Sequence, residues 1–149
     1  MQLGSVFIWN SFPFRREGIE KNRYFVYFGE SNYPDNPVKV FLITTTSKTY
    51  YYEEEGARKN HNYYRFKTGF FGFVEESILD VDSYYNIEKK DFEYYKEDLE
   101  EKGKLPEPIL KNIYNLILKS KNISMKVKQD IHTNYNLEGI TGLKKPKRK

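Results

Sequence analysis

The stretch VKVFLITTT, residues 38–46, indicates the fold more strongly than any other segment of the chain. It consists almost entirely of β-branched, aliphatic and aromatic side chains, which suit the pleated surface of a sheet. We therefore expect a strand here, placed near the centre of a sheet.

Shorter segments of similar composition lie on both sides of this stretch. They predict strands over residues 4–10, 23–29, 63–67 and 77–82, and residues 49–53 are expected to continue the central strand as a hairpin arm. Polar, Pro-containing or Gly-containing loops separate them. Five or six short strands with turns every 8 to 15 residues are typical of a small barrel or sandwich.

The last third of the chain predicts helix. Ile109, Ile113, Leu116 and Ile117 form one apolar stripe at helical spacing, and we expect this helix to close one end of the barrel. Ser124 is expected to cap a second helix that ends near residue 133. Before them, the acidic residues 88–102 predict a solvated helix or loop whose inward-facing residues are Phe92, Tyr95 and Leu99.

Composition supports a mainly β (α+β) domain. The 149 residues are 17% aromatic and include a single Ala, which argues against a helix bundle. We divide the chain into a barrel domain with its closing helix, residues 1–122, and a basic C-terminal extension, residues 123–149, that is partly helical or disordered. The absence of Cys excludes disulfides and iron–sulfur ligation. With no membrane-length apolar run and no secretory signal, we expect a soluble cytoplasmic protein without a membrane partner.

Charge is distributed unevenly. Residues 75–102 hold 4 Lys and Arg against 11 Asp and Glu, whereas residues 103–149 hold 11 against 3. A basic C-terminal third suggests a polyanionic partner, and nucleic acid is favoured over membrane because no amphipathic membrane helix accompanies it. The alternative for residues 143–149 is a solvated tail.

The order of the segments resembles the MazF/PemK-like toxin family. GSVFIWNSFPF at residues 4–14 is similar to the first strand and loop of that family, and Arg23 stands at the Arg position of its second strand. The third strand of the family resembles VKVFLITTTSK, residues 38–48. Its later strands resemble GFVEESILDVDSYYNIEKKDF at residues 72–92, and its closing helix resembles residues 103–117.

This resemblance implies an SH3-like barrel of five to seven strands with a C-terminal helix packed on it. It implies a toxin–antitoxin endoribonuclease, a hydrolase that cleaves single-stranded RNA through metal-independent attack by the 2′-OH. The enzyme would be a homodimer that a cognate antitoxin, protein or RNA, neutralises. Asp80 occupies the position of the family's catalytic Arg, so a non-catalytic barrel that binds RNA or protein is the alternative. A third hypothesis is an accessory protein of a phage or plasmid whose barrel only scaffolds assembly.

Metal-free RNA cleavage needs a base for the 2′-OH proton, donors for the charged phosphorane and an acid for the leaving oxygen. Asp82 stands at the family's Asp position and is the candidate base, and Arg23 is the candidate guanidinium. Hydroxyl groups would hold phosphate oxygens while an ammonium group neutralises charge, a role predicted for Thr45, Thr46, Ser47 and Lys48. Exposed strand carboxylates and an ordinary polar turn are the alternatives.

The remaining candidates would bind RNA. They combine loop cations, a loop imidazole and a strand that interleaves aromatic and cationic side chains: Arg15, Arg16, His61, Tyr64, Arg65 and Lys67. His61 would also serve as an acid if it reached the groove, because imidazole titrates near neutrality. A solvated loop and an ordinary barrel strand are the alternatives. With two His and no Cys, we predict no metal and no cofactor.

Overall fold

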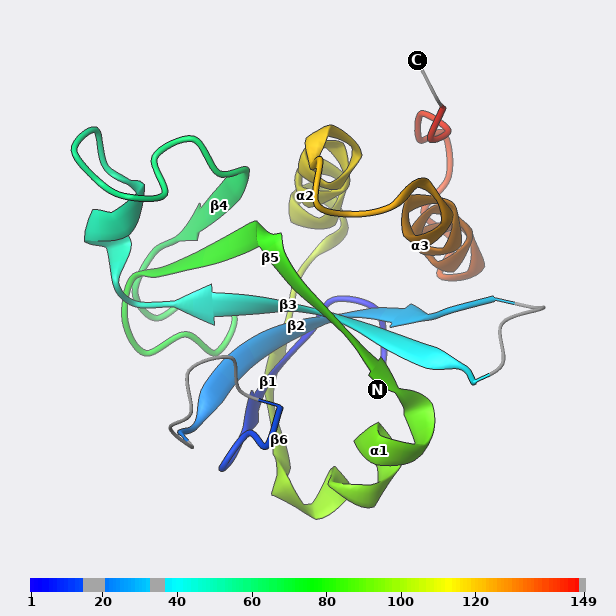
Figure 1. Ribbon diagram of the computed structural model, residues 1–149, viewed down its shortest axis with the longest axis horizontal. Helices are drawn as coiled ribbons and strands as arrows, with labels where there is room; N and C mark the ends of the chain where they lie inside the picture. The colour runs from blue at the N-terminus through cyan, green and yellow to red at the C-terminus, as the bar shows by residue number, and fades with distance from the viewer. Residues whose placement is uncertain (15–20, 33–36, 148–149) are drawn as a thin grey trace.

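The computed structural model describes residues 1–14, 21–32 and 37–147. Their six strands form one antiparallel sheet in the order β4-β5-β3-β2-β1-β6, which curls into a half-barrel (Figure 1). The strands are β1 (Ser5–Trp9), β2 (Arg23–Glu30), β3 (Lys39–Thr46), β4 (Tyr63–Phe66), β5 (Ser77–Glu88) and β6 (Leu99–Lys104). The helices are α1 (Lys89–Tyr94), α2 (Glu107–Lys119) and α3 (Met125–Leu137), with two 3-10 turns, η1 (Thr49–Tyr52) and η2 (Lys96–Asp98).

The mainly β fold with packed helices is confirmed, and β3 lies near the centre of the sheet as predicted. Alternate residues of β2 and β3 enter two different hydrophobic cores. Val26 and Ile43 face α2 and α3, whereas Phe25 and Leu42 face the side that α1 covers (Figure 1). Because both faces of these strands are buried, their sequences are almost continuously apolar rather than alternating.

Two elements differ from the sequence predictions. Residues 49–53 do not form a hairpin arm: Oγ1 of Thr46 accepts a hydrogen bond from the backbone N–H of Lys48 at 3.1 Å, and the chain turns there into η1. The prediction of a strand at this place was therefore wrong. The charged sequence LEEKGK, residues 99–104, forms the edge strand β6, which its composition did not indicate. An edge strand carries charged residues readily because one side of it faces solvent.

The turn between β4 and β5 approaches the outer side of β6. A Cβ atom added at Gly103 would lie 2.4 Å from the carbonyl oxygen of Phe71, so only glycine permits this contact. The GFFGF turn, residues 69–73, thereby lies beside the edge strand at the opposite end of the sheet. This approach helps the half-barrel to close around the core.

The C-terminal region contributes to the same core as the sheet. Ser124 caps α3 as predicted, accepting a hydrogen bond from the backbone N–H of Val127 at 3.2 Å, and the helix continues to Leu137. Ile131 and Tyr135 are buried against α2 and the sheet. A continuous core therefore crosses the boundary that the sequence placed after residue 122. Within the described ranges, no helix has both the length and the apolar character needed to cross a membrane.

Candidate functional site

A cleft of about 470 Å³ opens where β2 begins and β3 ends. Its walls come from four segments: residues 21–24, residues 44–48, the η1 turn with its following loop, and the segment that precedes β5. The predicted residues Arg23, Thr45, Thr46, Ser47 and Lys48 all line it. The structure thus brings these predicted residues together at one cleft, although they come from two different strands.

The cleft is cationic. Lys21, Arg23, Lys48 and Arg58 line it, against the single described acidic residue Glu75. In the described part of the chain, Lys21, Arg23 and Lys48 form no ion pair, and the buried Nε of Arg23 has no hydrogen-bond partner. Positive side chains that are not neutralised by neighbouring carboxylates are suited to binding phosphate groups.

The hydroxyl groups at the end of β3 are not equivalent. Thr45 is buried, and its Oγ1 donates a long 3.5 Å hydrogen bond to the carbonyl of Tyr24. Thr46 is half-buried and its Oγ1 fixes the backbone of Lys48, while Ser47 is exposed. Ser47 and Lys48 are thus the residues of this segment that are best placed to meet a ligand, and Thr45 and Thr46 shape the strand end.

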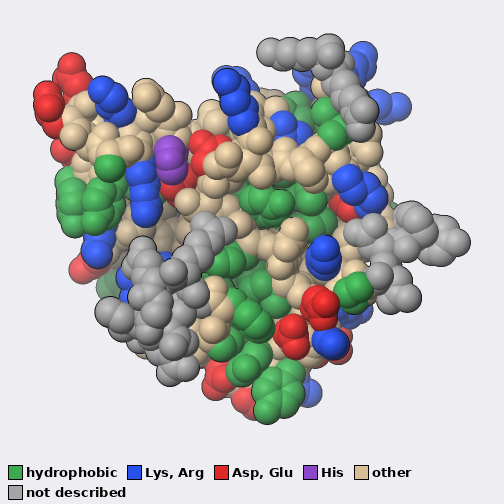
Figure 2. Space-filling view, viewed as in Figure 1, with side chains coloured by type: hydrophobic (Ala, Val, Ile, Leu, Met, Phe, Trp, Pro, Cys, Tyr) green, Lys and Arg blue, Asp and Glu red, His purple; other side chains and the backbone are tan. Residues whose placement is uncertain are grey.

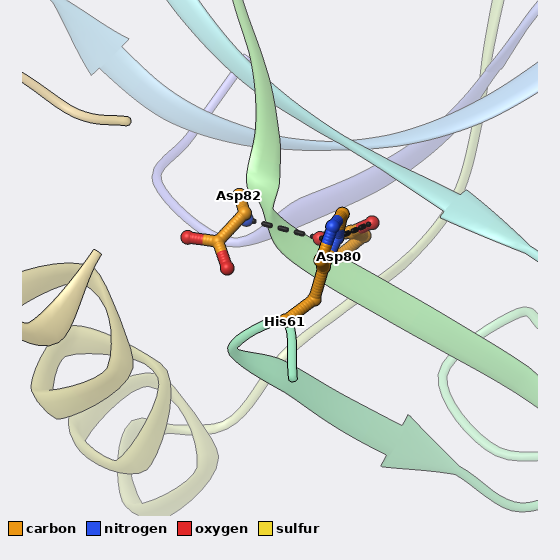
Figure 3. A group of neighbouring side chains, drawn as sticks. All are labelled: His61, Asp80 and Asp82. Atoms are coloured by element: carbon orange, nitrogen blue, oxygen red, sulfur yellow. Dashed lines mark hydrogen bonds and ion pairs between the residues drawn. The ribbon is translucent and has the colours of Figure 1, made fainter. Parts of the chain in front are cut away.

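A second group of polar side chains meets at Asp80. Asp80 is 1% exposed, and its carboxylate accepts a hydrogen bond from the hydroxyl of Tyr52 at 2.8 Å. It also accepts one from Nδ1 of His61 at 2.9 Å (Figure 3). The hydroxyl of Ser83 donates at 3.1 Å and the backbone N–H of Asp82 at 3.0 Å. A buried carboxylate requires such a set of donors, because its desolvation is otherwise costly.

These contacts define the orientation of His61. A carboxylate only accepts hydrogen bonds, so we assign the proton of the neutral imidazole to Nδ1, which leaves Nε2 as the acceptor. The side chain is 34% exposed, and it lies opposite Asp80 at the start of β4 (Figure 3). A carboxylate that holds one ring nitrogen while the other can exchange a proton is the arrangement found in general acid–base catalysis.

The Asp80 group is connected directly to the cleft. Nη1 of Arg58 donates to the hydroxyl of Tyr52 at 3.2 Å, and both side chains line the cleft wall. Burial raises the pKa of Tyr52 above its ordinary value. The hydrogen bond from Arg58 lowers this pKa by less than burial raises it, and the hydrogen bond to Asp80 raises it further. The Tyr52 hydroxyl therefore stays protonated and donates a hydrogen bond to the carboxylate of Asp80. The hydrogen bond to Tyr52 raises the pKa of Arg58, which stays charged.

Asp82 lies on the same strand but has different partners. Its carboxylate accepts hydrogen bonds from the hydroxyl of Ser120 at 2.6 Å and the backbone N–H of Asn62 at 2.7 Å, and it points away from His61 and Asp80 (Figure 3). It thus ties β5 to the end of α2 and to the loop that carries His61. Asp80 and Asp82 therefore each have their own set of hydrogen-bond donors.

His61, Asp80 and Asp82 are also the residues that could hold a cation. One ligand atom of each lies within 4.8 Å of the others. Nδ1 of His61 and the oxygens of Asp80 and Asp82 already take part in the hydrogen bonds described above. A metal ion would compete with those hydrogen bonds for the same oxygens.

Among the described residues that were predicted to bind RNA, none directly lines the cleft, and His61 is linked to it through Asp80 and Tyr52. On β4, Tyr64 packs against the main core, and the guanidinium of Arg65 forms an ion pair with Glu76. Lys67 is exposed just after that strand. Arg15 and Arg16 lie outside the described residues. Figure 2 shows a histidine at the surface between cationic and acidic side chains.

Three residues of the site were missed by sequence reasoning. Tyr52 and Arg58 lie in segments interpreted as a hairpin arm and a polar loop, and Ser83 was not among the predicted site residues. The sole signal was the Tyr-rich run TYYYE next to this polar loop. It does not reveal which ring turns inward, because a 3-10 turn does not follow strand alternation.

No protein-family model matches this chain, and no curated protein sequence matches it.

Proposed function

We propose that this protein is an endoribonuclease that cleaves single-stranded RNA in the cationic cleft, without a metal ion. The observation that carries the proposal is the buried Asp80, which holds Nδ1 of His61 beside a cleft lined by Lys21, Arg23 and Lys48. The cations supply phosphate binding and His61 supplies proton transfer. Both are needed for RNA cleavage, and neither requires a cofactor.

The chemistry is an in-line transfer within the RNA. Nε2 of His61 takes the proton from the 2′-OH, the 2′-oxygen attacks phosphorus, and the bond from phosphorus to the 5′-oxygen breaks. The leaving 5′-oxygen takes a proton from water on the opposite side of phosphorus and His61 releases its proton to solvent, so that the products are a 2′,3′-cyclic phosphate and a 5′-hydroxyl. Lys48 and Arg23 neutralise the charge that develops on the phosphorane, with Ser47 as a hydroxyl donor.

This assignment moves the base from Asp82 to His61. The partners of Asp82, which are Ser120 and Asn62, support a role in holding the loop of His61 against β5. In the family-based hypothesis Asp82 is the base, and the two hypotheses predict different variants to be inactive. Asp80 in the position of the family's Arg becomes the residue that orients His61.

We also propose that the half-barrel belongs to the SH3-like class and that the protein is a MazF/PemK-like toxin, active as a homodimer in the cytoplasm and neutralised by a cognate antitoxin. The packing of α2 across the curled sheet supports this assignment. Induced expression of the wild type is expected to arrest bacterial growth, and co-expression of a cognate antitoxin is expected to restore it. Growth arrest that persists in both His61→Gln and Asp82→Asn would contradict a toxicity based on RNA cleavage at this site.

The direct test is incubation of the purified full chain with labelled single-stranded RNA at low salt in the presence of EDTA. Wild type is expected to yield fragments with 2′,3′-cyclic phosphate ends. His61→Gln is expected to lower the rate by about 10²-fold or more, which is the usual contribution of a general acid–base group. His132→Gln is the matched control, because His132 lies on α3 away from the cleft residues.

The results also separate the two candidate bases. Loss of activity in Asp82→Asn with full activity in His61→Gln would assign the base to Asp82. RNA that stays intact with the wild type would refute the nuclease proposal.

A non-catalytic RNA-binding barrel is the second candidate. It is favoured by the complete set of donors around Asp80, which would also stabilise a purely structural junction between the loop of residues 47–62 and β5. It predicts RNA binding that weakens in Lys48→Gln, with no cleavage by any variant.

A further inference from the structure

The side chain of Arg58 is stacked on the η1 turn. Its guanidinium carbon lies 5.1 Å from the centroid of the Tyr51 ring and 6.0 Å from that of Tyr52. A cation at this distance from an aromatic face is attracted by the ring quadrupole. One face of the guanidinium is therefore covered by protein.

Two further contacts fix the orientation of this group. Nη1 of Arg58 donates to the hydroxyl of Tyr52, which is anchored in turn on the buried Asp80. The backbone N–H of Arg58 donates to the carbonyl of Tyr51 at 2.7 Å, which closes the loop beneath the side chain. The guanidinium is thus held by its contact with the Tyr51 ring and by its hydrogen bond to Tyr52.

The rest of the guanidinium is accessible from the cleft. The Arg58 side chain is 37% exposed and lines the cleft together with Lys48. Lys48 directly precedes η1, and a 3-10 turn rises about 2.0 Å per residue, so Tyr51 lies about 6 Å further along the turn. A phosphate held near Lys48 would therefore have the Tyr51–Arg58 stack as its neighbour.

A fixed guanidinium can donate to phosphate from its edge and also offers a flat cationic surface. Unpaired bases of single-stranded nucleic acid stack on guanidinium planes as well as on aromatic rings. We propose that Arg58, held over Tyr51 by its hydrogen bond to Tyr52, is the stacking platform for an unpaired base of single-stranded nucleic acid bound in the cleft. This inference rests on the proposed function, because it assigns the base subsite of the same cleft.

The test compares two probes that differ only in their bases. Binding of the full chain to a labelled oligouridine and to an abasic strand of equal length is measured by fluorescence anisotropy at low salt. Arg58→Lys keeps the charge and removes the plane. We expect it to weaken oligouridine binding about five- to tenfold, in line with the loss of one stacked base, and to change abasic binding by less than about twofold.

Lys48→Gln is the matched variant. It removes a phosphate-binding charge and is expected to weaken binding of both probes by the same factor. Tyr51→Leu removes the ring beneath Arg58 without changing charge, and it should reproduce the base-selective loss. If Arg58→Lys melts at a lower temperature than the wild type, Tyr51→Leu provides the independent test of base stacking.

Equal effects of Arg58→Lys and Tyr51→Leu on the two probes, or no effect on either, would overturn the stacking proposal while leaving phosphate binding in the cleft intact. Failure of the wild type to bind either probe would overturn the RNA-binding function and this inference together. The two failures are therefore distinguishable.

Discussion

The hydroxyl of Tyr52 donates a hydrogen bond of 2.8 Å to Oδ2 of Asp80, across 28 positions of sequence. This contact joins the η1 turn to β5 and thereby connects the cleft wall to the buried carboxylate that holds His61. Its geometry makes Tyr52 the link between the two halves of the candidate site.

The Tyr52→Phe variant tests this link. It leaves the ring in place but removes one donor from buried Asp80 and the acceptor of Arg58. Leaving a buried acceptor short of a partner costs about 1–3 kcal/mol, so we expect the free energy of unfolding in urea to fall by that amount. Tyr50→Phe is the control because Tyr50 is 57% exposed. Equal stabilities of the two variants would show that the Tyr52 hydroxyl contributes nothing to the fold.

The second prediction concerns Gly56, in the loop between η1 and Arg58. A Cβ atom at this position would lie 2.3 Å from the carbonyl oxygen of Tyr51, and backbone atoms must shift to accept it. We expect Gly56→Ala to displace the loop and weaken binding of single-stranded RNA severalfold, while the cores on both faces of the sheet are unaffected. Anisotropy titrations and a melting curve measure the two effects. Ala57→Gly, in the same loop, should bind RNA like the wild type; if Gly56→Ala does so too, the loop does not shape the cleft.

The third prediction is a loss of stability at alkaline pH. Burial raises the pKa of Tyr114 to about 12. Burial is also the largest cause that raises the pKa of Tyr27 to about 12, and the carboxylates of Glu30 and Glu138 raise that pKa further. The folded state holds these two protons more tightly than the unfolded chain does. The resulting contribution to the free energy of unfolding is therefore complete below about pH 10 and is lost as the pH rises towards 12. Urea unfolding at pH 9, 10 and 11 measures the decline.

Tyr114→Phe is the informative variant for this pH dependence. Phenylalanine cannot ionise, so the decline of stability above pH 10 should be shallower than in the wild type, although the variant also loses the hydrogen bond from the Tyr114 hydroxyl to the carbonyl of Lys144. A decline as steep as that of the wild type would show that Tyr114 does not contribute to the alkaline transition.

The fourth prediction concerns the basic end of the chain. The carbonyl of Lys144 accepts a hydrogen bond from Tyr114, so a truncation after Lys144 removes residues 145–149 and leaves this contact in place. If the four deleted cations neutralise phosphates of single-stranded RNA, the slope of log affinity against log salt should fall by up to about 3. The melting temperature should hardly change. An unchanged slope would mean that RNA is held by the cleft without help from these residues.

Local sequence determined the elements whose residues satisfy their own environment. The apolar run of residues 38–46 predicted β3 because a strand with two buried faces needs apolar side chains on both. The stripe containing Ile113 and Ile117 predicted α2, and Ser124 predicted the start of α3 because its hydroxyl caps the helix through a contact only three residues away. In each case the interactions that decide the conformation are local or periodic.

Only the tertiary structure decided the edge strand and the site. The sequence of β6 is charged, and it becomes a strand because β1 offers unpaired backbone groups about ninety positions away. Asp80 was identified as a departure from a family pattern, but its role depends on Tyr52 and His61, which reach it from another part of the chain. The residue type of an Asp does not indicate whether its carboxylate is solvated or buried among hydrogen-bond donors. The sequence therefore determined which groups are available for chemistry, and the folding of the loop of residues 47–62 onto β5 decided which of them meet.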